Sequence, residues 1–425
     1  MNDRSYRKTV LSNGIRVLTE RMPQVRSAAI GLWVGVGSAH EAPSLRGISH
    51  CIEHMLFKGT ATRSARDIAE LMDSIGGHLN AFTDKESTCY HARIVDAHVP
   101  LALEVLADMF VHSLFDPAEL HKEQQVILEE IRMYDDSPDE VSQDLFLKSV
   151  WQGSSLGEPT IGYAETVSAV TRDAITAYMQ QQYRPSSVVL SAVGNVDHEP
   201  FVAAVEARLG AMTPGTPPPD APEPIFVPAS IVKQKDCEQV YVLVGAEGVS
   251  ARDDRRYTMA VLDAILGGGM ASRLFQEIRE KRGLAYSIYS THNIYRSGGL
   301  FTVAASTRAK NAQEVVRLIR DELQRAATLG VESGELSRAK EHLKGSLLLS
   351  LESTSTRMLR LGRSELNLGR HVPIAEITAS IDAVTKKEVD AAARRAFDAD
   401  RLALTVVGPV DGAFEATSGS LAQSA

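Results

Sequence analysis

Hydrophobic and polar positions in the first third of the chain predict paired strands alternating with amphipathic helices. Asn13-Gly14 separates two β-prone runs and is the residue pair that favours a tight hairpin turn. A further strand is expected over 28–36, while 79–82 and 88–95 alternate like paired antiparallel strands. Other segments have the periodicity of helices. These expected helices cover 46–57, 64–75 with Ser64 as its N-cap, 99–114 and 118–134.

The second half of the chain repeats this order. Residues 167–197 align without gaps on residues 381–411, with nine identical positions among 31. In each copy, a threonine N-cap (Thr171 or Thr385) precedes a helix that leads into a β-rich run. The other elements expected in this half are strands at 240–245, 285–292 and 299–306, and helices at 255–266 and 271–281.

A proline-rich stretch at 213–224 divides the chain near its midpoint and predicts an extended linker, because proline can neither continue a helix nor donate to a strand ladder. We therefore expect a mixed α/β (α+β) fold made by tandem duplication. Its parts would be a first domain at 1–212, the linker at 213–224 and a homologous second domain at 225–425. Each domain is expected to hold a largely antiparallel sheet flanked by helices.

Composition narrows the classes of protein to consider. The 425 residues are 44% hydrophobic and 23% charged, as in globular domains, and no apolar run approaches the ~20 residues of a membrane helix. The net charge of −9 argues against nucleic acid as the main partner. Three scattered cysteines fit a reducing compartment, and the first residues resemble no targeting signal. A cytoplasmic location is therefore expected.

The segment His50-Cys51-Ile52-Glu53-His54 carries the strongest chemical signal. On a helix, a turn of about 100° per residue places His50, Glu53 and His54 on one face. Two imidazoles one turn apart suit a single zinc ion, and the neighbouring carboxylate can take a proton from zinc-bound water. This order of residues is the inverzincin motif. On the motif alone, a surface helix with a chance grouping of polar residues stays open.

A catalytic zinc also needs a third protein ligand, and the expected helix 118–134 offers candidates. Glu123 and Glu130 border the apolar stripe of this helix, whereas Glu129 points away from it. Carboxylates on the core side of a helix are costly unless something pairs them. The spacing thus favours Glu123 and Glu130 over Glu129 without choosing between the two, and ordinary ion-paired glutamates stay an alternative.

Four segments together resemble the M16 peptidase family, also called the pitrilysin or insulysin family. The resemblance covers nearly the whole chain and is strongest to half-length bacterial members, which are similar to mitochondrial processing peptidase subunits. The segments are GISHCIEHMLFKGT (47–60), GGHLNAFTDKESTCYHARI (76–94), EQQVILEEIRMYDD (123–136) and GGGMASRLFQEIREKRGLAYSIYS (267–290).

The resemblance implies roles for the residues around the motif. His50, His54 and Glu130 would be the zinc ligands, and Glu53 the general base. Glu123 matches the second glutamate of the family and would support the site.

The resemblance also implies substrate contacts. Arg279 and Tyr286 match an Arg-x6-Tyr pair that would hold the substrate backbone and the carbonyl that develops negative charge. Asn80 and Ala81 match an edge strand that would pair with an extended peptide, although an interior strand is the alternative. The second domain lacks the zinc motif and reads Ala-Val-Leu-Asp-Ala at 260–264.

Relatives in this family form a clamshell around a chamber, and a chain of this length corresponds to half of it. The resemblance therefore implies a dimer, either of identical chains or with another M16-like chain. The expected function is a zinc endopeptidase that cleaves unfolded peptides or leader segments, with Glu53 activating zinc-bound water. The alternative is a non-catalytic or heterodimeric subunit of a peptide-processing complex.

Overall fold

A computed structural model describes residues 5–410 and residue 414. The chain forms two compact units from interleaved segments. Unit 1 comprises Met1–Ile131, Pro159–Ala221 and Leu349–Pro373, and unit 2 comprises the remaining segments, Arg132–Glu158, Pro222–Leu348 and Ile374–Ala425. Each unit contains one sheet with flanking helices, as the mixed α/β prediction requires. The compact units differ from the two uninterrupted halves, because each half contributes one segment to the other unit.

Unit 1 is built on a six-stranded sheet with strand order β1-β2-β6-β3-β5-β4. Its neighbours pair antiparallel except β2 and β6, which pair parallel. The predicted hairpin joins the first two strands, with Gly14 at a φ of +99° in the turn. The strands are β1 (Tyr6–Val10), β2 (Arg16–Arg21), β3 (Ser27–Val34), β4 (His78–Thr83), β5 (Thr88–Val95) and β6 (Val188–Gly194).

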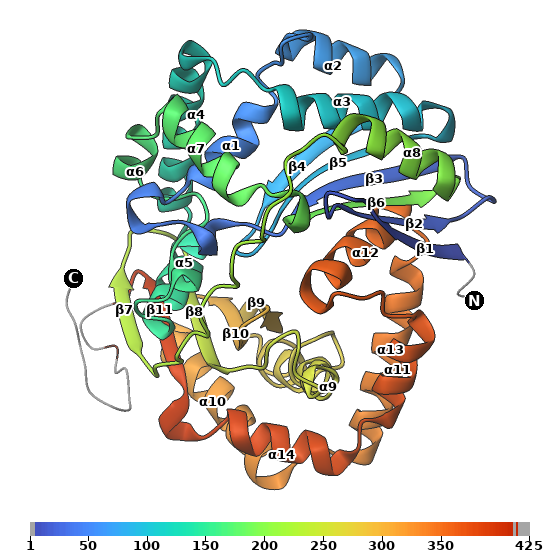
Figure 1. The fold of residues 1–425 in the computed structure, drawn as a ribbon. Helices are drawn as coiled ribbons and strands as arrows, with labels where there is room; N and C mark the ends of the chain where they lie inside the picture. Colours follow the sequence, from blue (N-terminus) through green and yellow to red (C-terminus); the bar gives the residue numbers. More distant parts are fainter. Residues whose placement is uncertain (1–4, 411–413, 415–425) are drawn as a thin grey trace. The chain divides into compact units, whose positions relative to one another are not determined.

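Helices cover both faces of this sheet (Figure 1). Alternate β3 residues such as Ile30 and Leu32 enter the larger core with α1, α3 and α8, whereas Ala29 and Trp33 enter a smaller core with α12. The bounds are α1 (Ile48–Leu56), α2 (Ala65–Ser74), α3 (Val99–His112), α4 (Pro117–Asp136), α6 (Ala164–Ser168), α7 (Arg172–Gln182), α8 (His198–Leu209) and α12 (Thr354–Leu368).

Unit 2 has a five-stranded sheet in the order β7-β11-β8-β10-β9, again with one parallel pair, β7 and β11. This order matches β2-β6-β3-β5-β4 of unit 1, as expected for a duplication. The strands are β7 (Ser230–Gln234), β8 (Val240–Glu247), β9 (Ala285–Ile294), β10 (Gly299–Thr307) and β11 (Ala403–Gly408). The helices are α5 (Pro138–Val150), α9 (Arg256–Leu266), α10 (Ala312–Leu329), α11 (Ser333–Ser350), α13 (Ile374–Ala383) and α14 (Lys386–Ala396).

The halves of the chain exchange equivalent helices. Helix α12 lies between β10 and β11 of the second sheet in sequence but packs on β3 and β6 of the first, whereas α5 lies between β5 and β6 of the first sheet and packs on β8 and β11 of the second. A glycine admits each helix: a Cβ on Gly31 would lie 2.4 Å from the Met358 sulfur, and one on Gly245 would lie 2.3 Å from the Phe146 ring. These glycines are separated by the same 214 positions that relate the repeated segments.

Local sequence signals also account for the starts of three helices. Ser64, Thr171 and Thr385 each cap a helix through the side chain, as predicted. The expected helix 271–281 is instead a short π-helix at Phe275–Glu280, and the described residues 213–224 form neither helix nor strand.

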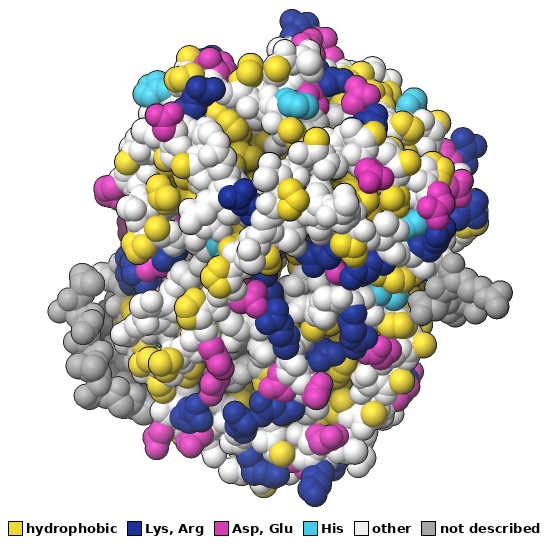
Figure 2. All heavy atoms as spheres, viewed as in Figure 1, with side chains coloured by type: hydrophobic (Ala, Val, Ile, Leu, Met, Phe, Trp, Pro, Cys, Tyr) yellow, Lys and Arg dark blue, Asp and Glu magenta, His cyan; other side chains and the backbone are white. Residues whose placement is uncertain are grey.

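Acidic and basic side chains are interspersed on the face of the molecule that Figure 2 shows. Among the helices of the described residues, none is long and apolar enough to span a membrane.

Candidate metal centre

Helix α1 carries the His-x-x-Glu-His segment and begins at Ile48, two residues later than expected. Gly47 precedes it with a φ of +90°, a conformation that suits glycine. The buried Glu41 carboxylate accepts hydrogen bonds from the Gly47 and Ser49 backbone N–H groups, both at 2.8 Å. Burial raises the pKa of Glu41 to about 7, although these two donors favour its charged form. Glu41 thus fixes the start of the helix next to His50.

His50, His54 and Glu130 come together between α1 and α4 in unit 1. The Glu130 Oε2 atom lies 3.9 Å from His50 Nε2 and 3.7 Å from His54 Nε2, and one ligand atom from each residue lies within 4.8 Å of the others. Burial, with a smaller effect of His54, lowers the pKa of His50 to about 4. His50 is therefore neutral at pH 7, the form of imidazole that binds a metal.

Glu123 is on α4, the helix that also carries Glu130, and it contacts the other ring nitrogen of His54. Its Oε2 atom is 3.1 Å from His54 Nδ1, and its Oε1 atom forms an ion pair with Lys58 Nζ at 2.7 Å. The Glu123 side chain is only 8% exposed, and these two partners contact one carboxylate oxygen each. The structure therefore separates the two glutamates that helix spacing left equivalent: Glu130 faces both imidazoles, and Glu123 contacts the far nitrogen of one.

Glu53 lies on the same face of α1 and is tied to the sheet. The Thr83 hydroxyl, at the end of β4, donates a 2.6 Å hydrogen bond to Glu53 Oε2. Burial raises the pKa of Glu53, and the hydrogen bond from Thr83 opposes that effect. The carboxylate is thus oriented between the edge strand and the histidines.

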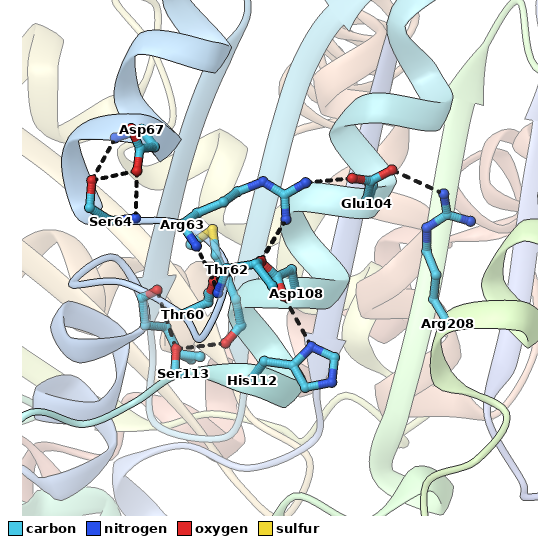
Figure 3. Close-up of polar contacts among 12 residues, drawn as sticks. Thr60, Thr62, Arg63, Ser64, Asp67, Glu104, Asp108, His112, Ser113 and Arg208 are labelled. Carbon is cyan, nitrogen blue, oxygen red and sulfur yellow. Dashed lines mark hydrogen bonds and ion pairs between the residues drawn. The ribbon is translucent and has the colours of Figure 1, made fainter.

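A polar network fixes the turn that follows α1 (Figure 3). Asp108 on α3 accepts hydrogen bonds from Thr60 at 2.8 Å, Thr62 at 3.0 Å and Arg63 at 2.7 Å. Its other oxygen lies 3.0 Å from His112 Nδ1. The turn directly follows α1, which carries His54, and the segment after His112 leads into α4. The network therefore fixes the chain next to both helices that carry the metal-ligand candidates.

Three of the remaining predicted residues lie on two edge strands, and the fourth, Arg279, lies on the π-helix Phe275–Glu280. Asn80 and Ala81 are on β4, which is an edge of the first sheet and not an interior strand. Tyr286 is on β9, an edge of the second sheet, and is 77% exposed. The Arg279 guanidinium lies 5.8 Å from the Tyr286 ring centre, so these two residues are neighbours within unit 2.

The second half repeats the helix without its chemistry. Six buried positions of α1 correspond to six buried positions of α9 at a constant separation of 210 residues. In that register, Ala260 and Ala264 replace the histidines and Asp263 replaces Glu53. The helix therefore kept its packing face while its polar face changed.

Sequence reasoning missed three residues of this site, namely Glu41, Lys58 and Thr83. Thr83 and Lys58 lie inside the segments that carry the family resemblance, but neither has a spacing signal of its own. Glu41 precedes the helix by a loop, and the sequence does not indicate that the loop folds back. Cys51, on the same helix, is a small and fully buried residue, and burial raises its thiol pKa to about 12.

Comparison with known proteins supports the resemblance. The sequence model of the insulinase family (peptidase family M16) matches residues 16–163, and that of the peptidase M16 inactive domain matches 169–343. A Bacillus subtilis protein named uncharacterized zinc protease YmxG is 44% identical over 93% of this chain and 97% of its own length. A Streptomyces coelicolor protein, also named an uncharacterized zinc protease, is 42% identical over 96% of this chain and 90% of its own.

Two solved structures share the fold, each with a TM-score of 0.89. A peptidase M16 inactive domain from Pseudomonas fluorescens is 21% identical and covers 97% of this chain and 98% of its own. A Helicobacter pylori protease is 20% identical and covers 95% of this chain and 99% of its own. Sequence matches to this family extend over both halves of the chain, and His50, Glu53 and His54 share one face of α1. The chain therefore belongs to peptidase family M16.

Proposed function

We propose that this chain is a zinc-dependent endopeptidase that cleaves extended segments of unfolded peptides. The observation that carries the proposal is the convergence of His50, His54 and Glu130, with the Glu53 carboxylate on the same face of α1. This set combines three metal-binding groups with a base, which is the minimum for metal-assisted hydrolysis.

The residues present fit a zinc ion. Two imidazole nitrogens and one carboxylate oxygen form a common ligand set of catalytic zinc sites. The 3.7 and 3.9 Å separations are close to the ~3.3 Å expected between two atoms that share one tetrahedral zinc ion. The bond between His54 Nδ1 and Glu123 leaves Nε2 directed toward Glu130, an arrangement typical of metal-binding histidines. The names of the relatives as zinc proteases agree with this assignment.

Each residue then has a defined task. Zinc, when bound, would polarise the peptide carbonyl and lower the pKa of water. Glu53 would accept a proton from the attacking water and return it to the departing amine, while Thr83 holds the carboxylate in place. Glu123 would orient His54, and Lys58 would balance the charge of Glu123.

The edge strand β4 supplies a place for the substrate. Its outer backbone groups have no neighbouring strand among the described residues, and an extended peptide can pair with them at Asn80 and Ala81. In a dimer, we assign Arg279 and Tyr286 of one chain to the metal centre of its partner, where they would contact the substrate backbone and the carbonyl oxygen that develops negative charge. Such recognition through the main chain favours unfolded peptides and leader segments.

The assembly and location are also proposals. We infer that the chain works as half of a clamshell in a dimer, with an identical or related M16 chain, in the cytoplasm. We further infer that residues 1–212 and 225–425 descend from one duplicated domain, because their sheets share one strand order. A non-catalytic subunit is the competing function, and the retained His50, Glu53, His54 and Glu130 argue against it.

One experiment tests the proposal. Cleavage of an unstructured, quenched-fluorescent peptide is measured for wild type, Glu53→Gln and Glu119→Gln, with zinc content determined for each. Glu119 is a matched control, because it lies on α4 and pairs with Lys122 at the surface. We expect zinc in all three proteins and loss of cleavage only in Glu53→Gln. Equal background rates in wild type and Glu53→Gln would contradict the proposal.

A further inference from the structure

The two sides of edge strand β4 have different surroundings. Leu79 and Ala81 pack toward the core that contains α1, and Thr83 on the same side bonds to Glu53. Phe82 points to the opposite side and packs with the smaller core beneath α12. Successive residues of a strand point to opposite faces of the sheet, so a peptide paired with β4 would present alternate side chains to these two environments.

Arg363 is the charged group on the α12 side. It comes from α12, and its guanidinium carbon lies 5.6 Å from the centre of the Phe82 ring. The Phe82 ring packs against the rings of Trp33 and His91, with centroid separations of 5.7 and 6.0 Å. The guanidinium therefore lies on a ring that its neighbours hold in place. Arg363 is exposed, and among the described residues no carboxylate forms an ion pair with it.

Asp84, the first residue after β4, does not form an ion pair with Arg363. Its carboxylate accepts hydrogen bonds from the backbone of Glu86 and from the backbone and hydroxyl of Ser87. It is therefore committed to the turn between β4 and β5. The Arg363 guanidinium lies over the Phe82 ring and has no ion-pair partner among the described residues, so its N–H groups can bind a carboxylate from another molecule.

We propose that Arg363 is a specificity-determining residue that selects an acidic side chain at one position of the peptide bound to β4. Directly opposed residues of paired strands have Cβ atoms ~5 Å apart, so the peptide side chain opposite Phe82 comes beside the guanidinium. This inference rests on the proposed function, because it requires a peptide on β4. It adds that the substrate class carries an Asp or Glu on the side that faces away from the metal centre.

The test uses a set of quenched-fluorescent peptides in which a single Asp or Lys is moved along a neutral, unstructured sequence. The ratio of kcat/KM for each Asp and Lys pair is measured for wild type, Arg363→Gln and Arg363→Glu. Arg7→Glu is the matched control: Arg7 is an exposed arginine on β1, at the opposite edge of the sheet. Five strand spacings separate the edges, or roughly 24 Å. Circular dichroism verifies the fold of every variant.

We expect wild type and Arg7→Glu to prefer Asp at one position by about fivefold, as for a partly exposed ion pair. Arg363→Gln should abolish this preference, and Arg363→Glu should reverse it in favour of Lys at the same position. A preference for Asp that persists in Arg363→Glu would overturn the proposal. So would an equal loss for all peptides, which would indicate that Arg363 only supports Phe82.

Binding separates this inference from the proposed function. The same peptides, labelled with a fluorophore, are titrated against Glu53→Gln with and without Arg363→Glu, and anisotropy is recorded. A reversal of the Asp preference in these inactive proteins would support Arg363 as a selector even if wild type cleaves nothing. Binding that is indifferent to charge in both proteins would refute the inference even if wild type cleaves every peptide.

Discussion

Glu123 offers a quantitative test of the metal centre. The Glu123→Ala change removes the carboxylate that lies 3.1 Å from His54 Nδ1 and pairs with Lys58 at 2.7 Å. Loss of such a partner of a metal-binding histidine typically weakens metal binding by 10–100-fold, or about 1.4–2.8 kcal/mol. We expect about 100-fold for Glu123→Ala, because the imidazole loses the acceptor that contacts its Nδ1 atom. Lys58 adds little to this cost, since its side chain is 29% exposed and can turn to water.

Glu123→Gln should be milder, at about tenfold. Its amide oxygen can still accept from His54, but its N–H group faces a second donor in Lys58, and the imidazole loses the basicity that a charged partner provides. Zinc dissociation constants are measured by competition with a chromogenic chelator, with Glu119→Ala as the control on the same helix. A zinc affinity of folded Glu123→Ala within twofold of wild type would show that Glu123 does not orient a metal-binding imidazole.

Three further predictions concern stability. The pKa of Glu41 is raised from 4.5 to about 7 in the folded protein, so protonation of this carboxyl stabilises the fold. That stabilisation is complete below pH 4.5 and is lost as pH rises through 7. The stability of wild type relative to Glu41→Gln should therefore fall by up to about 3 kcal/mol between pH 4 and 8, measured by urea denaturation. Gly31→Ala should lower the free energy of unfolding by about 1–3 kcal/mol through overpacking. Gly345→Ala, in an open helical position, should raise the free energy of unfolding by about 0.5–1 kcal/mol. Equal effects of the two changes would contradict this prediction. Arg357→Met should cost about 3–5 kcal/mol by leaving Glu20 buried and unpaired, and adding Glu20→Met should restore most of it.

Much of the fold follows from local sequence signals. The Asn13-Gly14 turn, the Ser64 cap and the strands from 79 to 95 were predictable, because turns, caps and alternation are short-range features. The repeated segment also predicted two similar domains. The exchange of α5 and α12 could not be predicted, because the identity of the sheet that a helix covers depends on contacts between distant residues.

The candidate site shows the same division. Helical periodicity placed His50, Glu53 and His54 on one face, and the structure has them there. The same geometry left Glu123 and Glu130 equivalent, because both border the core side of α4 and only the position of α1 distinguishes them. The hydrogen bond from Thr83 to Glu53 crosses from a strand to a helix, so spacing along the chain carries no trace of it.

The exchange of helices has a consequence for synthesis of the protein on the ribosome. The metal-ligand candidates all lie before residue 131, yet Trp33 is covered by α12, whose residues end at Leu368. A nascent chain that has emerged only as far as the 213–224 stretch therefore cannot bury that face of its first sheet. We expect the hydrolytic unit to mature late in translation, which would delay proteolytic activity until nearly the whole polypeptide has been made.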